Sequence, residues 1–225
     1  MSARRIQIAL LMTFALLAAG SQALAQGRGR GGPFGGSTDG MRVNLLAVTQ
    51  VQDALKLSDE QKTKLTKLTD DYRSQMQELR QGLGQVSDEE RQKKFAEMGE
   101  KTKAAADEAG KILSKEQSDR LGQIVLQAQG AGALHDEKVA AELKLTDDQK
   151  QRLSSIGEET RNKMRENFQN QGGQEKGQEI MKESNEKSLA VLTAEQREQF
   201  AKMQGEKIDL PPGAAFGFGG RRRQQ

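Results

Sequence analysis

The 225-residue chain has no cysteine and a single histidine, which excludes disulfides, thiol nucleophiles and metal sites built on cysteine or on paired histidines. Charged residues make up 30% of the chain and aromatic residues only 4%, so a thick apolar core is not expected. Seven of the 35 basic residues but one of the 32 acidic residues lie outside 41–210, so the central body is slightly acidic although the whole chain carries +3.

The N-terminus has the pattern of a secretory signal peptide. Arg4 and Arg5 precede a short apolar run at 8–19, and Ala23 and Ala25 form a small-x-small cleavage site. The run is shorter than the ~20 residues of a comfortable membrane span, although an uncleaved anchor is the alternative. We therefore expect residues 1–25 to be removed after Ala25, leaving a periplasmic protein with no transmembrane span.

Glycine and arginine dominate two segments, 26–40 and 211–225, which hold 11 of the 24 glycines. Neither segment can bury enough apolar surface to offset its chain entropy, so both are predicted to be disordered tails. Basic tails can contact nucleic acid or an anionic surface, but solvated tails are the favoured interpretation. Nucleic acid is therefore not an expected partner.

The body at 41–210 contains no proline, and its apolar residues recur at helical spacing. A short helix is expected near 44–55, followed by a long helix that starts at Ser58. A turn at Gly82 and Gly84 leads into a returning helix. The expected apolar stripe of the long helix comprises Leu65, Leu68, Tyr72, Met76, Leu79 and Leu83, and that of the returning helix Phe95, Met98, Thr102, Ala105, Ala109 and Ile112.

One phrase, L-[S/T]-x-[D/E]-Q, occurs four times, at 57–61, 113–117, 145–149 and 192–196. It is a capping box: the Ser or Thr accepts from a first-turn N–H, and the Gln reaches back to the N-cap N–H. We expect its residues to be structural rather than a contact site. They are Leu57, Ser58, Gln61, Leu113, Ser114, Gln117, Leu145, Thr146, Gln149, Leu192, Thr193 and Gln196.

The motif also reveals an internal duplication, because residues 54–76 align with 142–164 without a gap. We expect two tandem helical repeats, 41–133 and 134–210, joined by a glycine-rich hinge at 130–132. The expected long stripe of the second repeat comprises Leu153, Ile156, Thr160, Met164 and Phe168.

The predicted fold is all-α, with elongated antiparallel helical hairpins in two tandem repeats and disordered Gly/Arg-rich tails. The apolar stripes are narrow, so one face of each hairpin lacks cover unless the other repeat or a partner supplies it. Most mature methionines fall on the stripes, where core packing is favoured over an adaptable binding surface.

Catalysis has little support in the sequence. His135 precedes a helix beside the glycine-rich hinge, where a capping or exposed role is expected. No pair of histidines and no loop of alternating carboxylates is available for a metal. We expect no enzyme activity, catalytic residue, metal site or cofactor, and the residues that would bind a client are not identified.

The four motif copies, the export signal and the hairpin plan resemble the LTxxQ-motif family, which includes Spy/CpxP-type periplasmic chaperones and metal-sensing envelope proteins. Two copies, at 145–149 and 192–196, match the motif literally, and the other two have Ser for Thr. The resemblance implies an all-α, ATP-independent stress-response chaperone that holds partly unfolded envelope proteins. Two motif pairs in one chain depart from the family pattern, and the metal-sensing branch is disfavoured because its histidine ligands have no counterpart beyond His135.

Two classes of function follow from these observations. The first is an exported chaperone-like protein that binds partly unfolded clients, alone or as a homodimer. The alternative is an envelope scaffold or interaction protein, or an accessory to a metal-stress or membrane sensor, without holding activity.

Overall fold

The computed structural model describes residues 37–84, 86–171, 173–211 and 213–214. These residues all belong to one compact unit, Gly31–Gln225. The predicted signal peptide at 1–25 and the larger part of both predicted tails lie outside the described residues.

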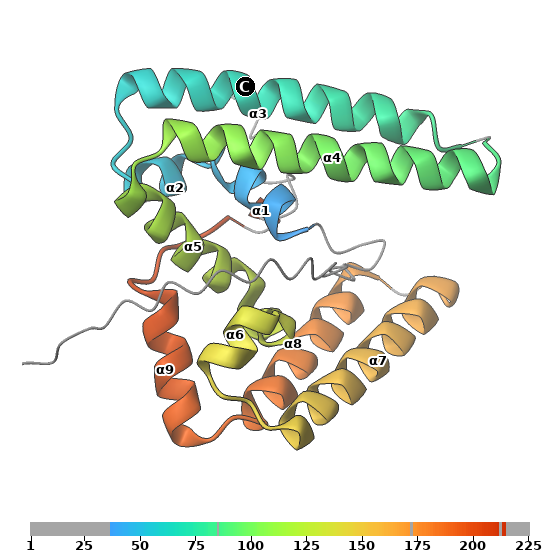
Figure 1. The fold of residues 1–225 in the computed structure, drawn as a ribbon. Coiled ribbons are helices and arrows are strands. Elements are labelled where there is room, and N and C mark those ends of the chain that lie inside the picture. The colour runs from blue at the N-terminus through green and yellow to red at the C-terminus, as the bar shows by residue number, and fades with distance from the viewer. Residues whose placement is uncertain (1–36, 85, 172, 212, 215–225) are drawn as a thin grey trace, which may run out of the picture. The chain divides into compact units, whose positions relative to one another are not determined.

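The described residues form α-helices, one 3-10 helix and no strand, which confirms the all-α prediction (Figure 1). None of these helices is long and apolar enough to cross a membrane. In chain order they are α1 (Thr38–Leu45), α2 (Thr49–Ala54), α3 (Asp59–Gln81), α4 (Asp88–Ile112), α5 (Lys115–Gln129), the 3-10 helix η1 (Gly130–His135), α6 (Glu137–Glu142), α7 (Asp147–Gln169), α8 (Gln174–Ala190) and α9 (Ala194–Gln204).

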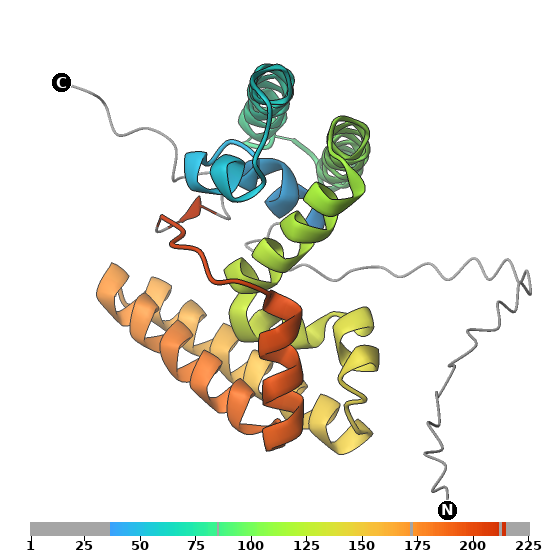
Figure 2. The ribbon, with the colours of Figure 1, turned by 90° about the vertical axis from the view of Figure 1, so that its left-hand side faces the viewer.

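A first apolar cluster joins α1, α2 and α5 to the adjoining ends of α3 and α4. Leu45, Leu46, Leu65 and Ile124 are fully buried in it. Beyond the cluster α3 and α4 continue side by side, as Figures 1 and 2 both show. Along this part of α3 and α4, the buried side chains include the small or polar Thr69, Thr102 and Ala105.

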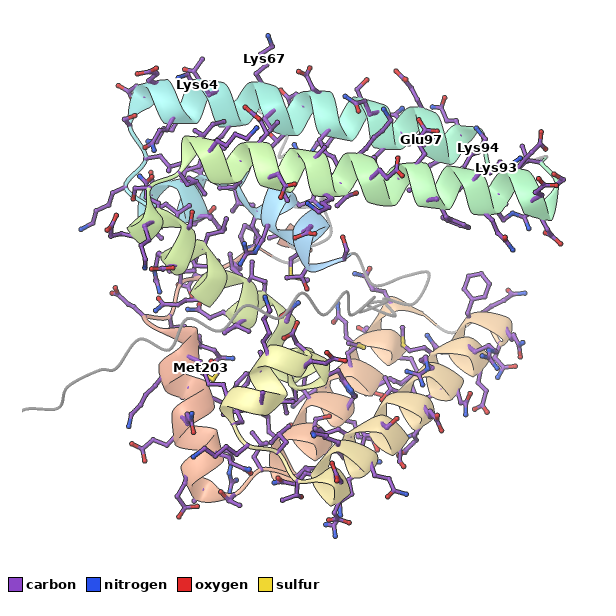
Figure 3. The ribbon with its side chains drawn as sticks, viewed as in Figure 1. Lys64, Lys67, Lys93, Lys94, Glu97 and Met203 are labelled. Carbon is purple, nitrogen blue, oxygen red and sulfur yellow. The ribbon has the colours of Figure 1, made fainter. Side chains whose placement is uncertain are left out.

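A second apolar cluster begins at Ala131 and draws on η1, α6 and the starts of α7 and α9. Leu134, Leu143 and Leu153 are fully buried, and Met203 of α9, labelled in Figure 3, packs against the cluster. The expected hinge at 130–132 is instead part of η1, which contacts α5, α6, α7 and α8. The segment is packed in this structure, since Ala131 and Ala133 are both buried.

The contact between α7 and α8 is more polar than that between α3 and α4. Ile180 and Ser188 are the buried residues of α8, and Thr160 donates a hydrogen bond to Ser184 at 2.8 Å. Met164 and Phe168, expected on the buried stripe of α7, are exposed, and so is Phe95 of α4. Around Met164 the stripe of α7 is only partly covered, because α8 contributes the small residues Gly177 and Ser184 beside the buried Ile180.

Both ends of the body extend beyond the predicted limits. Ser37 caps α1, which starts at Thr38 inside the segment expected to be a tail, and its Gly40 is buried against Tyr72. At the other end, Ala214 is buried in the first cluster. The chain after α9 therefore runs back from the second cluster to the first, and we call residues 205–211, 213 and 214 the C-terminal strap.

Candidate functional site

Each copy of the repeated motif forms a capping box at the start of a long or terminal helix. Ser58, Ser114, Thr146 and Thr193 each accept from the backbone N–H three residues later, and the motif Gln accepts from the cap's own N–H. The leucine that precedes each cap is buried, two of them in each cluster. The motif therefore fixes where a helix begins and anchors that point in a core.

The motif glutamines also bind one another in two pairs, which periodicity does not predict. Gln61 Nε2 donates to Gln117 Oε1 at 2.8 Å, and Gln117 Nε2 donates back at 3.0 Å. Gln149 and Gln196 form the same reciprocal pair at 2.6 and 3.1 Å. Each pair joins the starts of two helices that are far apart in the sequence, α3 with α5 and α7 with α9.

The remaining N–H of each amide caps the C-terminal end of another helix. Gln61 and Gln149 donate to the carbonyls of Ile112 and Val191, just before the partner motifs. Gln117 and Gln196 donate to the carbonyls of Leu55 and Leu143, the C-caps of α2 and α6. Four helix ends thus meet at each pair, and every amide hydrogen and oxygen of the four glutamines is used.

A fifth capping box shows what the pairing adds. Ser87 caps α4 with Glu90 in the place of the motif Gln, and this box is exposed. A carboxylate accepts the cap N–H as well as an amide does, but it has no hydrogen to donate. Capping alone therefore does not require glutamine, whereas the paired junctions do.

His135 ends η1 and is largely exposed, as expected, with its ring near Gly157 of α7. Partial desolvation of the ring, with the positive charge of Arg161, lowers the pKa of His135. No group of three or more His, Asp or Glu side chains among the described residues is arranged to hold a metal ion.

An open, shallow groove with apolar side chains runs along α7 and α8. Met164, Met181 and Leu189 provide its apolar surface, and Gly173 and Gly177 keep it open. Met181 is 48% exposed, and at the end of α7 Phe168 is 86% exposed. The sequence placed Met164 and Phe168 on a stripe and predicted that one face of each hairpin would lack cover, but it did not show that these two side chains would lie on the uncovered face.

The rim of this groove is mainly uncharged. Asn167, Gln174, Gln178 and Asn185 line it with amides, and Lys182 and Glu186 are its charged residues. Amide groups both donate and accept, so they match the backbone of any polypeptide. By contrast, lysines and acidic residues cover the outer surface of α3 and α4, where Lys67 projects away from α4 (Figure 3).

Four charges tie α7 to α8 close to this groove. Lys163 and Lys187 each contact both Glu159 and Glu183 at 2.8 to 2.9 Å. The hydrogen bonds from Lys163 and Lys187 lower the pKa of Glu183 to about 2. Two of these pairs, Lys163–Glu183 and Lys187–Glu159, cross from one helix to the other, beside the Thr160–Ser184 hydrogen bond.

Comparison of the chain with models of protein families, with curated proteins and with solved structures gave no match.

Proposed function

We propose that the protein is an exported, ATP-independent chaperone-like protein that holds partly unfolded proteins of the cell envelope. The observation that carries the proposal is the apolar groove on α7 and α8, where Met164, Met181 and the nearby Phe168 are exposed together. Methionine is flexible and polarizable, so such a surface adapts to different apolar side chains. Apolar side chains exposed beside a rim of amide groups suit weak contacts with apolar segments of a client.

The proposal includes an origin by tandem duplication, with one helical hairpin in each repeat. Its support is the second glutamine pair, which reproduces the hydrogen bonds of the first at equivalent positions. The helices before the motifs also end alike, since Lys56 and Lys144 take the left-handed conformation with φ of 50° and 51°. Export to the periplasm rests on the sequence of residues 1–25 alone.

Light scattering from a chemically denatured client, diluted into buffer without nucleotide, tests the function. We expect the full mature chain to slow aggregation in proportion to its concentration. A chain that is folded but gives no suppression at several-fold excess would favour the scaffold function instead.

A pair of variants localises the activity. Met164→Ser with Met181→Ser removes the apolar surface of the groove and is expected to weaken suppression severalfold. Phe95→Ser is the matched control, because it removes an exposed apolar side chain of α4 outside the groove. Equal losses in both variants would contradict a localised groove.

A further inference from the structure

We infer that the C-terminal strap occupies a second peptide-binding site, on α5 and the first apolar cluster, and that an extended apolar segment of a client displaces it. The strap follows Gly205, whose φ of 63° ends α9. Over the four residues 207–210, exposed and half-buried residues alternate, with Ile208 and Leu210 toward the first cluster and Lys207 and Asp209 exposed. This period of two is that of an extended chain with one face on an apolar surface.

The side chain of Gln127 recognises the strap through its main chain. Its Nε2 donates to the carbonyls of Gln204 and Glu206, both at 2.7 Å, and its Oε1 accepts from the N–H of Ile208 at 3.1 Å. Arg120 Nη2 donates to the same Glu206 carbonyl at 2.7 Å. None of these contacts involves a side chain of the strap. Gly205 lies between the two carbonyls that Gln127 binds, however, and a Cβ at this position would overlap the side chain of Gln123, so the contacts require glycine there.

Apolar side chains supply the rest of the contact. Ile208 and Leu210 pack against the first cluster without being fully buried, and Ala214 is buried in it. Main-chain hydrogen bonds combined with pockets for alternate side chains are the usual means by which proteins bind extended peptides. The chemistry therefore selects a peptide segment that has a glycine at the position of Gly205, followed by an extended stretch with apolar residues two apart.

The strap's covalent attachment makes it a competitor of such a segment. A site that is open for only a fraction of the time has its apparent affinity reduced by that fraction. The strap would thus keep the apolar strip of the first cluster covered until client segments are abundant. The inference rests on the proposed function only for the identity of the displacing peptide.

Binding of a fluorescent peptide to the full mature chain tests the inference. The peptide has the sequence of residues 205–214 with serine in place of Lys207, and its binding is followed by fluorescence polarisation. Ile208→Ser with Leu210→Ser should weaken the strap without touching α5. If the native strap is closed about nine tenths of the time, this variant binds the peptide about tenfold more tightly. Lys207→Ser with Asp209→Ser is the matched control on the exposed side of the strap and should bind as the native chain does.

Adding Gln127→Ala to the weakened strap removes the main-chain recognition and should abolish the gain in affinity. A weakened-strap variant with unchanged helical circular dichroism that binds no more tightly would overturn the inference. An equal gain in the Lys207 and Asp209 control would overturn it as well.

Proteolysis of the native chain gives a second measurement if the weakened-strap variant does not fold. An excess of the same peptide, which has no trypsin site, should accelerate cleavage after Lys207, because that bond becomes accessible when the strap leaves α5. A peptide with serine at both apolar positions should not. No acceleration by the apolar peptide would contradict the inference. A different outcome is that the peptide binds as expected while neither the native chain nor the weakened-strap variant slows aggregation of a denatured client. In that case the strap site stands and the proposed function fails.

Discussion

At the scale of single residues, the four motif glutamines explain why the repeated phrase ends in Gln. The capping role was predictable, because the spacing of Ser or Thr and Gln is a local signature. The pairing of Gln61 with Gln117, and of Gln149 with Gln196, was not, since a local pattern does not say which helix ends meet. Each amide connects its own helix, its partner and the end of a third helix.

Replacing Gln149 by Glu tests this role while preserving the cap. The new carboxylate would still accept from Thr146 but would lose both donations and face the oxygens of Gln196 and Val191. Leaving partly buried acceptors unpaired costs about 1–3 kcal/mol, so we expect the free energy of unfolding in urea to fall by that amount. The exposed control Glu90→Gln should change it by no more than about 0.5 kcal/mol.

The penalty of Gln149→Glu should also depend on pH. Burial and the facing oxygens raise the pKa of the introduced carboxyl in the folded state, so its protonated form is favoured there. The loss of stability should therefore shrink as the pH falls through that raised pKa, because a protonated carboxyl can donate one hydrogen bond. The role of Gln149 at the junction would be contradicted if its loss of unfolding free energy did not depend on pH. An equally large loss in Glu90→Gln would contradict it as well.

At the scale of elements, the second helix pair is less well buried than the first. In α3 and α4 the contact includes the buried Met76, whereas α7 and α8 rely on the four charges around Glu183 and on the Thr160–Ser184 hydrogen bond. The all-α class and the helix starts at the four motifs followed from the sequence, whereas the short helix expected near 44–55 is instead two helices, α1 and α2. The exposure of Met164 and Phe168 did not follow from the sequence, because it depends on the small side chains of a helix about 20 residues away in the chain.

The charge cluster predicts an acid sensitivity of this helix pair. The pKa of Glu183 is about 2 in the folded protein, below its ordinary 4.5, so the unfolded chain takes up the proton first. Stability from Glu183 is present above pH 4.5 and lost as the pH falls from 4.5 towards 2. Over that window the melting temperature of the native chain should fall more steeply than that of Glu183→Gln. If the melting temperatures of the native chain and of Glu183→Gln fall in parallel with pH, the stabilising role of Glu183 is contradicted.

At the scale of the whole molecule, the sequence predicted an all-helical body and the motif positions but missed the strap. Gly205 and Pro211 bracket a short non-helical segment, which favours a tail at the level of local pattern. Its contacts are with α5, almost 80 residues earlier, and only the alternation of Ile208 and Leu210 indicated an extended, half-buried chain. The two surfaces proposed to bind peptide segments are the groove on α7 and α8 and the strip beneath the strap.

Hydrogen exchange of the full mature chain, with and without a chemically denatured client, tests the central claim most directly. Client binding should slow exchange along α7 and α8 where they border the groove, and should speed exchange at the N–H of Ile208 as the strap leaves Gln127. The outer parts of α3 and α4 serve as an internal reference and should not change. Slower exchange confined to α3 and α4 would contradict the account. So would unchanged exchange at the groove, measured at a client concentration at which the protein suppresses aggregation of that client.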